Sequence, residues 1–239
     1  MIDALKQKPN INVKVILEEQ DTLLSSEPVP PWNVCFVKGR GLLLQAQALR
    51  LELAGIPTYN NAYAIHVTNH RLLYSLLAQA AGVPEPEFAV GHEKDIPFEE
   101  YVIKEECVES VAKFIPIIGN RNLRGGGVND KIYYFQRKIN SEWEYKIYSF
   151  GENFFYYKEK PTLINPNKMA TRVSIPENPL LREYVEKIKK ITKLTITSID
   201  FLEEDGQYYL IDVNSAPNFN YIQNGAEILA DWLFSEIKR

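Results

Sequence analysis

The sequence predicts a protein of mixed α and β structure, because two kinds of apolar periodicity alternate along its 239 residues. Residues 195–219 contain two β-rich runs separated by Asp205-Gly206, a dipeptide that favours a tight hairpin turn. Residues 42–53 and 178–191 instead repeat apolar side chains at helical spacing. We therefore expect strands and helices to be interleaved, with the hairpin at 195–219 as the best-defined element.

Composition and charge narrow the class of protein. Hydrophobic residues make up 45% of the chain, and the net charge of -4 with a pI near 5.6 argues against nucleic-acid binding through a basic face. No apolar run is long enough for a membrane span, and no signal-peptide pattern is present. Cys35 and Cys107 lack the spacing of a metal site or a disulfide framework, so a cytoplasmic location is expected.

The first 62 residues are expected to form a short α/β domain. Residues 11–17 and 34–38 are expected to be strands, with a proline-rich loop between them. An amphipathic helix then follows Gly39-Arg40-Gly41 and stops at Gly55, and residues 56–60 resemble a short strand. The apolar residues at helical spacing in this helix are Leu42, Leu43, Ala46, Leu49 and Leu53.

The same signals predict the helices and strands after residue 62. Thr68 or Asn69 can cap a second helix that stops at Gly82, and Asn178-Pro179 is a strong start for a later one. The buried stripe of the second helix is expected to comprise Leu72, Leu73, Leu76, Leu77 and Ala80. Strands are expected at 101–104 and 131–139, a hairpin around Gly151-Glu152 at 143–157, and a last helix at 226–237.

The hairpin at 195–219 carries acidic and amide side chains at matching positions. A turn at Asp205-Gly206 places Asp200 almost opposite Asp212, with their Cβ atoms about 5 Å apart. Strand alternation puts Asn214 and Leu210 on the same face. Two carboxylates this close repel unless a cation lies between them, and oxygen ligands favour Mg²⁺ or Mn²⁺ over zinc. Two solvated acids on an ordinary hairpin are the alternative.

The motif Ser198-Ile199-Asp200-Phe201, followed by residues 209–217 (Tyr-Leu-Ile-Asp-Val-Asn-Ser-Ala-Pro), resembles the metal-binding end of the ATP-grasp superfamily. The resemblance implies that Asp200, Asp212 and Asn214 hold Mg²⁺ or Mn²⁺ against the phosphates of ATP. It also implies a fold of two lobes that clasp ATP, formed by residues 63–239 with a hinge near 136–139. Residues 1–62 would be an abbreviated N-terminal domain.

The same resemblance implies which side chains contact ATP. Lys104 matches a phosphate-binding strand lysine, Lys146 would face the nucleotide, and Arg172 matches an arginine that touches the γ-phosphate; the latter two are predicted to be catalytic. Arg71 stands where the family has a lysine. Each of these four cations also fits an ordinary surface or strand-end position. The complete predicted ATP-binding set is Arg71, Lys104, Gln136, Arg137, Lys138, Ile139, Lys146 and Arg172.

Residues 119–127 are the most glycine-rich stretch of the chain. Gly125-Gly126-Gly127 would let backbone N–H groups approach an anion, and Arg121 and Arg124 add positive charge. The stretch therefore predicts a loop that covers phosphates, and a plain flexible connection is the alternative.

Together these features predict an ATP-grasp ligase resembling the RimK-like branch. Such an enzyme uses ATP and magnesium to turn a carboxylate into an acylphosphate that an amine then attacks, with release of ADP and phosphate. A small molecule or a peptide is the expected acceptor. Aspartate at 212, where many such ligases have glutamate, also resembles the inositol-phosphate kinase branch. One alternative is a small-molecule kinase, with His66, His70, Arg121 and Arg124 as candidates to bind a polyphosphate acceptor. The other is a nucleotide-binding protein without catalysis.

Overall fold

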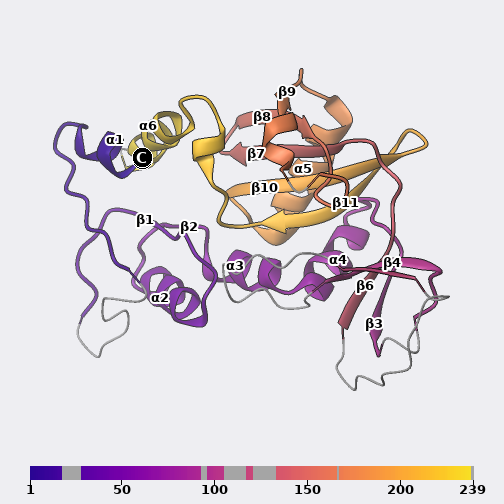
Figure 1. The fold of residues 1–239 in the computed structure, drawn as a ribbon. Coiled ribbons are helices and arrows are strands. Elements are labelled where there is room, and N and C mark those ends of the chain that lie inside the picture. Colours follow the sequence, from indigo (N-terminus) through magenta and orange to yellow (C-terminus); the bar gives the residue numbers. More distant parts are fainter. Residues whose placement is uncertain (18–27, 93–95, 105–116, 121–132, 166, 238–239) are drawn as a thin grey trace.

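A computed structural model describes residues 1–17, 28–92, 96–104, 117–120, 133–165 and 167–237, and these contain two main sheets (Figure 1). The five-stranded sheet has the order β11-β10-β7-β8-β9 and the four-stranded sheet has the order β3-β6-β4-β5. A parallel pair, β1-β2, lies with helices α2 and α3 on the N-terminal side. The mixed α and β class predicted from the sequence is confirmed.

The N-terminal region is built from short elements. They are α1 (Ile2–Lys6), β1 (Cys35–Phe36), α2 (Leu42–Leu53), β2 (Thr58–Tyr59) and α3 (Ala62–Asn69). The strand expected at 11–17 is wrong, since these residues form no strand. Val15 and Leu17 are 42% and 47% exposed, so the apolar side chains that suggested a strand do not reach a core.

Helices α2 and α4 (Arg71–Ala80) form, but they present other faces to the protein than the spacing predicted. The predicted cap of α4 is wrong, because Thr68 and Asn69 belong to α3 and His70 precedes α4 without a side-chain capping bond. In α2 the buried residues are Ala48 and Leu51. In α4 they are Tyr74, Ser75 and Ala78. Both helices carry apolar residues on more than one side, and the periodicity therefore did not fix the buried face. The predicted residues that are exposed instead are Leu42, Leu43, Leu49, Leu53, Leu73, Leu76 and Ala80.

The five-stranded sheet carries the predicted hairpins. Its strands are β7 (Glu144–Phe150), β8 (Asn153–Glu159), β9 (Val173–Ser174), β10 (Ile196–Glu204) and β11 (Gln207–Asn214). Asp205 and Gly206 join β10 to β11 with φ angles of 53° and 79°, which both residue types tolerate in a tight turn. Helices α4 and α5 (Pro179–Thr192) pack on one face through a large apolar cluster. The Asn178 side chain caps α5 as predicted, accepting hydrogen bonds from the Leu180 and Leu181 amides.

A β-bulge in β11 changes the pattern expected for this hairpin. Asp200 pairs with Asp212 as predicted, but Phe201 pairs with Leu210, so Ile211 is the extra residue. Leu210 is therefore fully buried in the apolar cluster rather than on the face of Asp212, which corrects the strict alternation assumed from the sequence. The bulge leaves Ile211 outside the regular ladder next to a predicted metal ligand.

The four-stranded sheet forms the second lobe. Its strands are β3 (Phe88–Gly91), β4 (Glu100–Lys104), β5 (Ile117–Asn120) and β6 (Tyr133–Arg137). All its strand pairs are antiparallel. Tyr101, Ile103 and Phe135 pack with Ile96 on one face, which leaves the alternate residues Lys104 and Gln136 on the other.

Buried Asn60 joins the N-terminal region to the five-stranded sheet. Its side-chain amide donates to the carbonyls of Ile196 (2.6 Å) and Ser215 (2.8 Å), and its oxygen accepts from the amides of Thr195 (2.8 Å) and Ile196 (2.9 Å). Asn60 therefore anchors both the start of β10 and the segment after β11.

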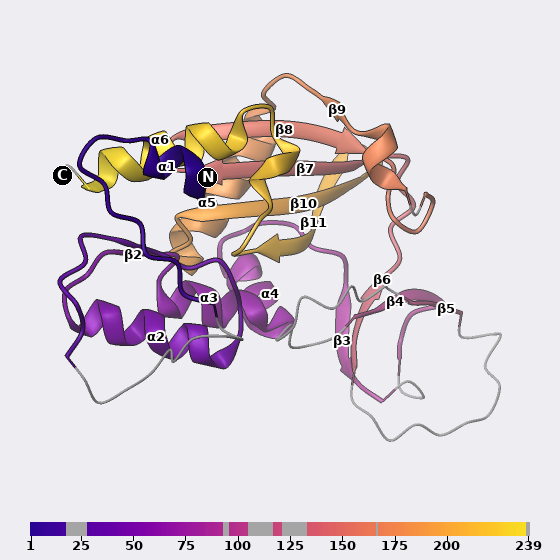
Figure 2. The same cartoon turned by 60° about the vertical axis from the view of Figure 1, so that its left-hand side comes forward.

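At the far end of the N-terminal region, α1 lies beside α6 (Gly225–Ile237), as both views show (Figure 2).

We expect Asn60→Ala to lower the free energy of unfolding by about 2–4 kcal/mol, because several buried backbone groups lose their partners. Urea unfolding followed by circular dichroism measures this. Asn153→Ala is the matched control, since its side chain makes a single long bond, 3.3 Å to the Phe150 carbonyl. Equal losses in the two variants would contradict the anchoring role of Asn60.

Candidate functional site

The predicted metal and phosphate residues lie in one row across the five-stranded sheet. Asp212 is paired with Asp200, Asp200 with Lys146, and Lys146 with Tyr157. Directly paired residues share a face of the sheet. The adjacent row contains Asn214 and Ser198, also directly paired. The sequence therefore brings Asp200, Asp212, Asn214 and Lys146 together as expected.

Each of the three predicted metal ligands is contacted by a different cationic side chain. The Lys146 ammonium lies 2.5 Å from both carboxylate oxygens of Asp200. Arg71, the first residue of α4, donates from Nη1 to Asp212 Oδ1 at 3.0 Å. Arg40 donates to Asn214 Oδ1. Positive charge from three separate parts of the chain thus offsets the repulsion between the two acids.

The acids and the cations of this row shift one another's pKa values. Burial raises the pKa of Asp212, but the charges of Arg71 and Arg40 outweigh burial and hold that pKa far below its ordinary value. Burial lowers the pKa of Lys146, and Asp200 and Glu144 outweigh it, so the pKa of Lys146 is raised. Asp212 and Lys146 therefore keep their full charges at neutral pH.

Arg40 was not predicted as a site residue. It lies between Gly39 and Gly41 just before α2, and a lone cation between two glycines ahead of a helix was the only sequence signal. Its carbonyl accepts hydrogen bonds from Gln45 Nε2 (2.8 Å) and Asn69 Nδ2 (2.6 Å), which fix the backbone. The guanidinium is thereby aimed at Asn214 from outside the predicted ATP-binding domain.

Lys104 links the two lobes. It ends β4, is 8% exposed, and donates to Gln136 Oε1 (2.5 Å) on its own sheet and to the Ile211 carbonyl (2.7 Å) on β11. That carbonyl belongs to the extra residue of the bulge. Burial, with the nearby positive charge of Arg71, lowers the pKa of Lys104 to about 7. A buried lysine whose charge is this costly is well suited to meet an anion such as phosphate.

Arg172 belongs to a second group of charges beside Lys146. Its Nε donates to Glu159 Oε2 (2.5 Å) and its Nη1 to the Tyr148 hydroxyl (3.2 Å). Lys146 and Arg172 both lie 5.9 Å from the centre of the Tyr148 ring. Lys168, which the sequence did not single out, bridges Glu144 (2.7 Å) and Glu159 (3.2 Å). Arg172 is therefore held at the border of the row rather than in direct contact with the predicted metal ligands.

Residues 136–139, the predicted adenine-binding hinge, comprise the end of β6 and the first residues of its connection to β7. The Arg137 and Lys138 amides donate to the carbonyls of Glu87 (2.8 Å) and Glu100 (3.1 Å), and the Arg137 side chain pairs with Glu204 at 3.0 Å. Ile139 is buried. Because these two amides already donate hydrogen bonds within the protein, adenine would have to bond to other backbone groups of the segment.

Other predicted residues lie apart from the row or outside the described residues. Arg121, Arg124 and the Gly125-Gly126-Gly127 loop are outside the described residues. His66 and His70 have ring centres 5.0 Å apart where α3 meets α4. Their predicted role beside the acceptor of a kinase stays a prediction.

The oxygen ligands of the row suit a magnesium ion. In the described part of the chain no three His, Cys, Asp or Glu side chains cluster as a complete metal site. Two carboxylates and an amide are available instead, from Asp200, Asp212 and Asn214. Magnesium in nucleotide sites takes one or two carboxylates and completes its coordination with water and phosphate, so this incomplete set fits.

Comparison with known proteins gives matches at the level of structure. No protein-family model matches the chain, and no curated protein sequence matches it. A RimK domain ATP-grasp protein from Sphaerobacter thermophilus superposes with a TM-score of 0.67 at 14% identity, covering 91% of this chain and 87% of that chain. The ATP-grasp ligase PsnB, complexed with a precursor peptide and AMPPNP, gives a TM-score of 0.64 at 15% identity, with coverage of 82% and 66%. The chain has the ATP-grasp fold.

A third match extends the comparison to another kind of ligase with this fold. The D-alanine–D-alanine ligase from Bacillus anthracis, complexed with ATP, gives a TM-score of 0.57 at 14% identity and covers 81% of this chain and 72% of that chain. The chain spans slightly less than two thirds of the length of PsnB. The ATP-grasp fold predicted from the Asp200, Asp212 and Asn214 motif is confirmed. Among the described helices, none combines the length and apolar character that a membrane crossing requires.

A buried carboxylate lies next to Lys104 in this ATP-grasp fold. Glu85 accepts a hydrogen bond from the Ser75 hydroxyl (3.0 Å), and Ser75 also contacts the Tyr134 hydroxyl (2.8 Å). The second carboxylate oxygen of Glu85 is buried without a hydrogen-bond partner. Burial raises the pKa of Glu85 from 4.5 to about 7, against the lowering effects of Ser75 and Lys104.

This raised pKa predicts a pH-dependent stability. Between pH 4.5 and about 7 the folded protein keeps a proton on Glu85 that the unfolded chain has released. The stabilisation is complete below pH 4.5 and is lost as the pH rises to 7. Relative to Glu85→Gln, the wild type should lose on the order of 1–2 kcal/mol across this window, after allowance for solvent screening.

Urea unfolding at a series of pH values measures the difference between the wild type and Glu85→Gln. Glu87→Gln serves as the control, because Glu87 is an exposed neighbour on the same segment. Parallel pH curves for the wild type and Glu85→Gln would show that Glu85 ionises normally in the folded protein.

Proposed function

We propose that this protein is an ATP- and Mg²⁺-dependent ligase that activates a carboxylate as an acylphosphate for attack by an amine. The observation that carries the proposal is the row of Asp212, Asp200 and Lys146, flanked by Arg71 and Lys104 where the two lobes meet. Acids that can hold magnesium beside cations that can hold phosphates are the parts that phosphoryl transfer requires. The similar solved structures include ligases, which supports this class.

The proposed reaction has two steps. A carboxylate oxygen of the substrate bonds to the γ-phosphorus of ATP while the bond from that phosphorus to the β,γ-bridging oxygen breaks, which gives an acylphosphate and ADP. The amine then bonds to the acyl carbon, the bond between that carbon and the phosphate oxygen breaks, and phosphate leaves as the nitrogen loses a proton. Both steps move negative charge among oxygens, so positioning and charge stabilisation are the main tasks of the protein.

The residues of the row divide these tasks. Asp200, Asp212 and Asn214 would hold Mg²⁺, which neutralises phosphate charge when bound. Lys104 would contact the α- and β-phosphates from the four-stranded sheet, Arg71 would contact phosphate from α4, and Lys146 would contact the transferred group. Arg172 would approach the γ-phosphate from beside Tyr148, after exchange of its bond to Glu159.

The binding of ATP would require the cations of the row to change partners. Arg71 and Lys146 pair with Asp212 and Asp200, and both would turn toward phosphate when magnesium binds between the acids. Their positive charge would stay next to the acids throughout, which limits the electrostatic cost of the exchange.

Asp212→Asn should reduce Mg²⁺-dependent formation of ADP roughly 10–100-fold, because a neutral amide is a weaker magnesium ligand. The fold should stay intact, since the substitution keeps the size of the side chain. ADP release at varied Mg²⁺ concentration measures the effect, with circular dichroism as the check on folding. Asp231→Asn is the control, because the Asp231 side chain lies on the exposed side of α6. Unchanged activity and Mg²⁺ dependence in Asp212→Asn would remove Asp212 from the metal site.

The class of reaction is decided by following the γ-phosphate of labelled ATP with pooled amino acids, peptides, short carboxylates and inositol phosphates. We expect label in free phosphate only when a carboxylate and an amine are both present. Label retained on a hydroxyl-bearing acceptor would identify a kinase instead. Binding of Mg²⁺ and ATP without turnover across the whole panel would identify a nucleotide-binding protein without catalysis.

A further inference from the structure

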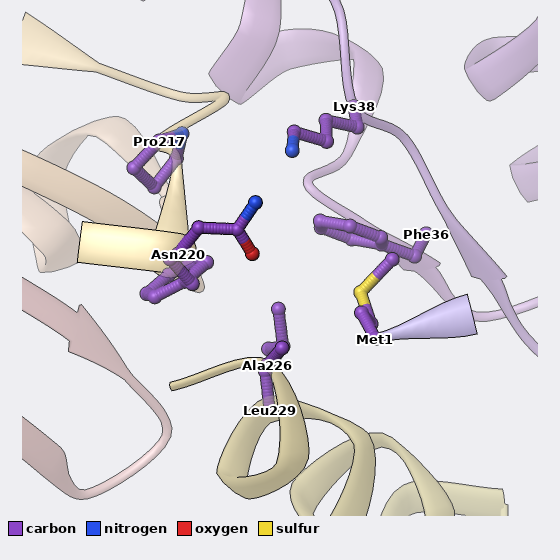
Figure 3. A pocket seen from close by; sticks show the side chains of 8 residues that line it. Met1, Phe36, Lys38, Pro217, Asn220, Ala226 and Leu229 are labelled. Carbon is purple, nitrogen blue, oxygen red and sulfur yellow. The ribbon is translucent and has the colours of Figure 1, made fainter. Parts of the chain in front are cut away.

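Polar side chains also gather in places away from the row. One is a hollow between the start of α1, the end of β1, the segment after β11 and the start of α6 (Figure 3). It has room for about one water molecule, and its polar residues Lys38 and Asn220 are exposed. Another is a buried set of hydrogen-bonded side chains between α4 and the four-stranded sheet, which we call the Glu85 network. Its members are Glu85, Ser75, Tyr134, Gln136 and Lys104.

The Glu85 network is continuous from one end to the other. The Lys104 ammonium donates to Gln136 Oε1 at 2.5 Å, and Gln136 Nε2 donates to the Tyr134 hydroxyl at 3.2 Å. The hydroxyl oxygens of Tyr134 and Ser75 are 2.8 Å apart, and Ser75 donates to Glu85 Oε1 at 3.0 Å. Lys104 and Tyr134 are direct partners across β4 and β6, and Gln136 follows two residues later, so all three share one face of the sheet.

Every donor in the network points from Lys104 toward Glu85. An ammonium has only donors, so Gln136 must turn its oxygen to Lys104 and its NH₂ group to Tyr134. Because the Ser75 hydrogen is directed to Glu85, the bond between the two hydroxyls is donated by Tyr134. Hydrogen bonds aligned in one direction polarise one another. The network therefore favours a positive charge on Lys104 together with a negative charge on Glu85.

The links of the network are shielded from water. Ser75 and Tyr134 are fully buried, Gln136 is 2% exposed and Lys104 is 8% exposed. The second carboxylate oxygen of Glu85 is buried without a hydrogen-bond partner among the described residues. Charges act over longer distances here than in water, since the local dielectric constant is low. Lys104 accordingly acts to lower the pKa of Glu85, and Glu85 acts to raise the pKa of Lys104.

Both ends of the network are held at neighbouring residues of β11. Lys104 donates to the Ile211 carbonyl at 2.7 Å. The carbonyl of Pro84, the residue before Glu85, accepts from the Leu210 amide at 2.8 Å. The fixed φ angle of Pro84 further restricts the backbone next to Glu85. The bulged part of β11 thus fixes the two charged ends relative to each other.

We propose that Glu85 is a positioning residue for nucleotide binding, which acts through its network to keep the Lys104 ammonium charged and directed at the phosphates of ATP. The bond from Lys104 to Gln136 remains when a phosphate oxygen takes the place of the Ile211 carbonyl. The inference rests on the proposed function, to which it adds a residue outside the predicted ATP-binding set.

Charges on other elements also act on Lys104. Arg71 of α4 disfavours its positive charge, whereas Asp212 of β11 and Glu144 of β7 favour it. Asp212 would hold magnesium once ATP is bound, so much of its charge would be shared with the metal. Glu85 is not a predicted metal ligand, and the charge that lowers its pKa is that of Lys104. Its support for Lys104 therefore persists when the metal binds.

The test compares the binding of ADP and of adenosine by calorimetry at pH 8 without Mg²⁺, which separates phosphate contacts from contacts to base and sugar. Glu85 is ionised at this pH, because its pKa is about 7. We expect Glu85→Gln to weaken ADP binding about five- to tenfold and adenosine binding less than about twofold. Glu87→Gln, an exposed position on the same segment, is the matched control and should change neither. Equal losses for both ligands in Glu85→Gln would show a purely structural role and overturn the proposal.

Further variants test the path from Glu85 to Lys104. Tyr134→Phe removes the hydroxyl in the middle of the network, and it should weaken ADP while sparing adenosine. Normal ADP affinity in this variant would overturn the path. In a Lys104→Met background, Glu85→Gln should cause no further loss of ADP affinity, because the group on which it acts is gone. The same five- to tenfold loss in that background, within about twofold, would show that Glu85 does not act through Lys104.

The outcomes separate this inference from the ligase proposal. ADP binding that depends on Glu85, without turnover across the panel of acceptors, would refute only the ligase. Turnover combined with an ADP affinity that Glu85→Gln leaves unchanged would refute only the positioning role. No binding of ADP to the wild type would refute both.

Discussion

Two carboxylates that face each other across neighbouring strands set the main constraint on this structure. Asp200 and Asp212 are direct partners in the hairpin. Asp200 is buried near the buried acid Glu144, and Asp212 is partly exposed. Such a pair is stable only with positive charge close by. The chain supplies it from Lys146 on the adjacent strand, Arg71 at the start of α4 and Arg40 before α2. The N-terminal region is therefore part of the electrostatics of the hairpin rather than an appendage.

The contact between the two lobes also places a buried charge beside a group that compensates it. Lys104 crosses from the four-stranded sheet to the Ile211 carbonyl, a dipole rather than a full negative charge. Burial lowers its pKa to about 7, so this carbonyl only partly compensates the buried ammonium. A phosphate group at this point would compensate it more fully.

The sequence predicted the elements whose signals are local. The Asp205-Gly206 turn fixed the register that pairs Asp200 with Asp212, and Asn178-Pro179 fixed the start of α5. The buried face of α2 was mispredicted because its leucines occur on several sides. In α4 the leucines share one face, but tertiary packing buries the opposite face with Tyr74, Ser75 and Ala78. The bulge at Ile211 was missed because alternation of side chains contains no signal for one extra residue.

The sequence predicted the site residues that lie in a recognisable motif. Asp200, Asp212, Asn214 and Lys146 stand on two hairpins with clear turns, so their meeting on one face follows from pairing alone. Arg40 and Lys168 reach the charged cluster from segments far away in sequence, and no local pattern connects them to it. The amide of Asn60 likewise has no signal in the sequence, because its four hydrogen bonds depend on how two distant strand ends are placed.

The bulge in β11 also affects how readily this edge strand could pair with a strand of another chain. β11 is an edge strand of the five-stranded sheet, and edge strands expose backbone groups that can pair with another chain. Here the Ile211 carbonyl accepts from Lys104 and the Leu210 amide donates to the Pro84 carbonyl at 2.8 Å. The irregular backbone beside the predicted metal ligands is thus capped from within the molecule. These two contacts, which come from outside the sheet, leave fewer backbone groups of β11 available for pairing with another chain.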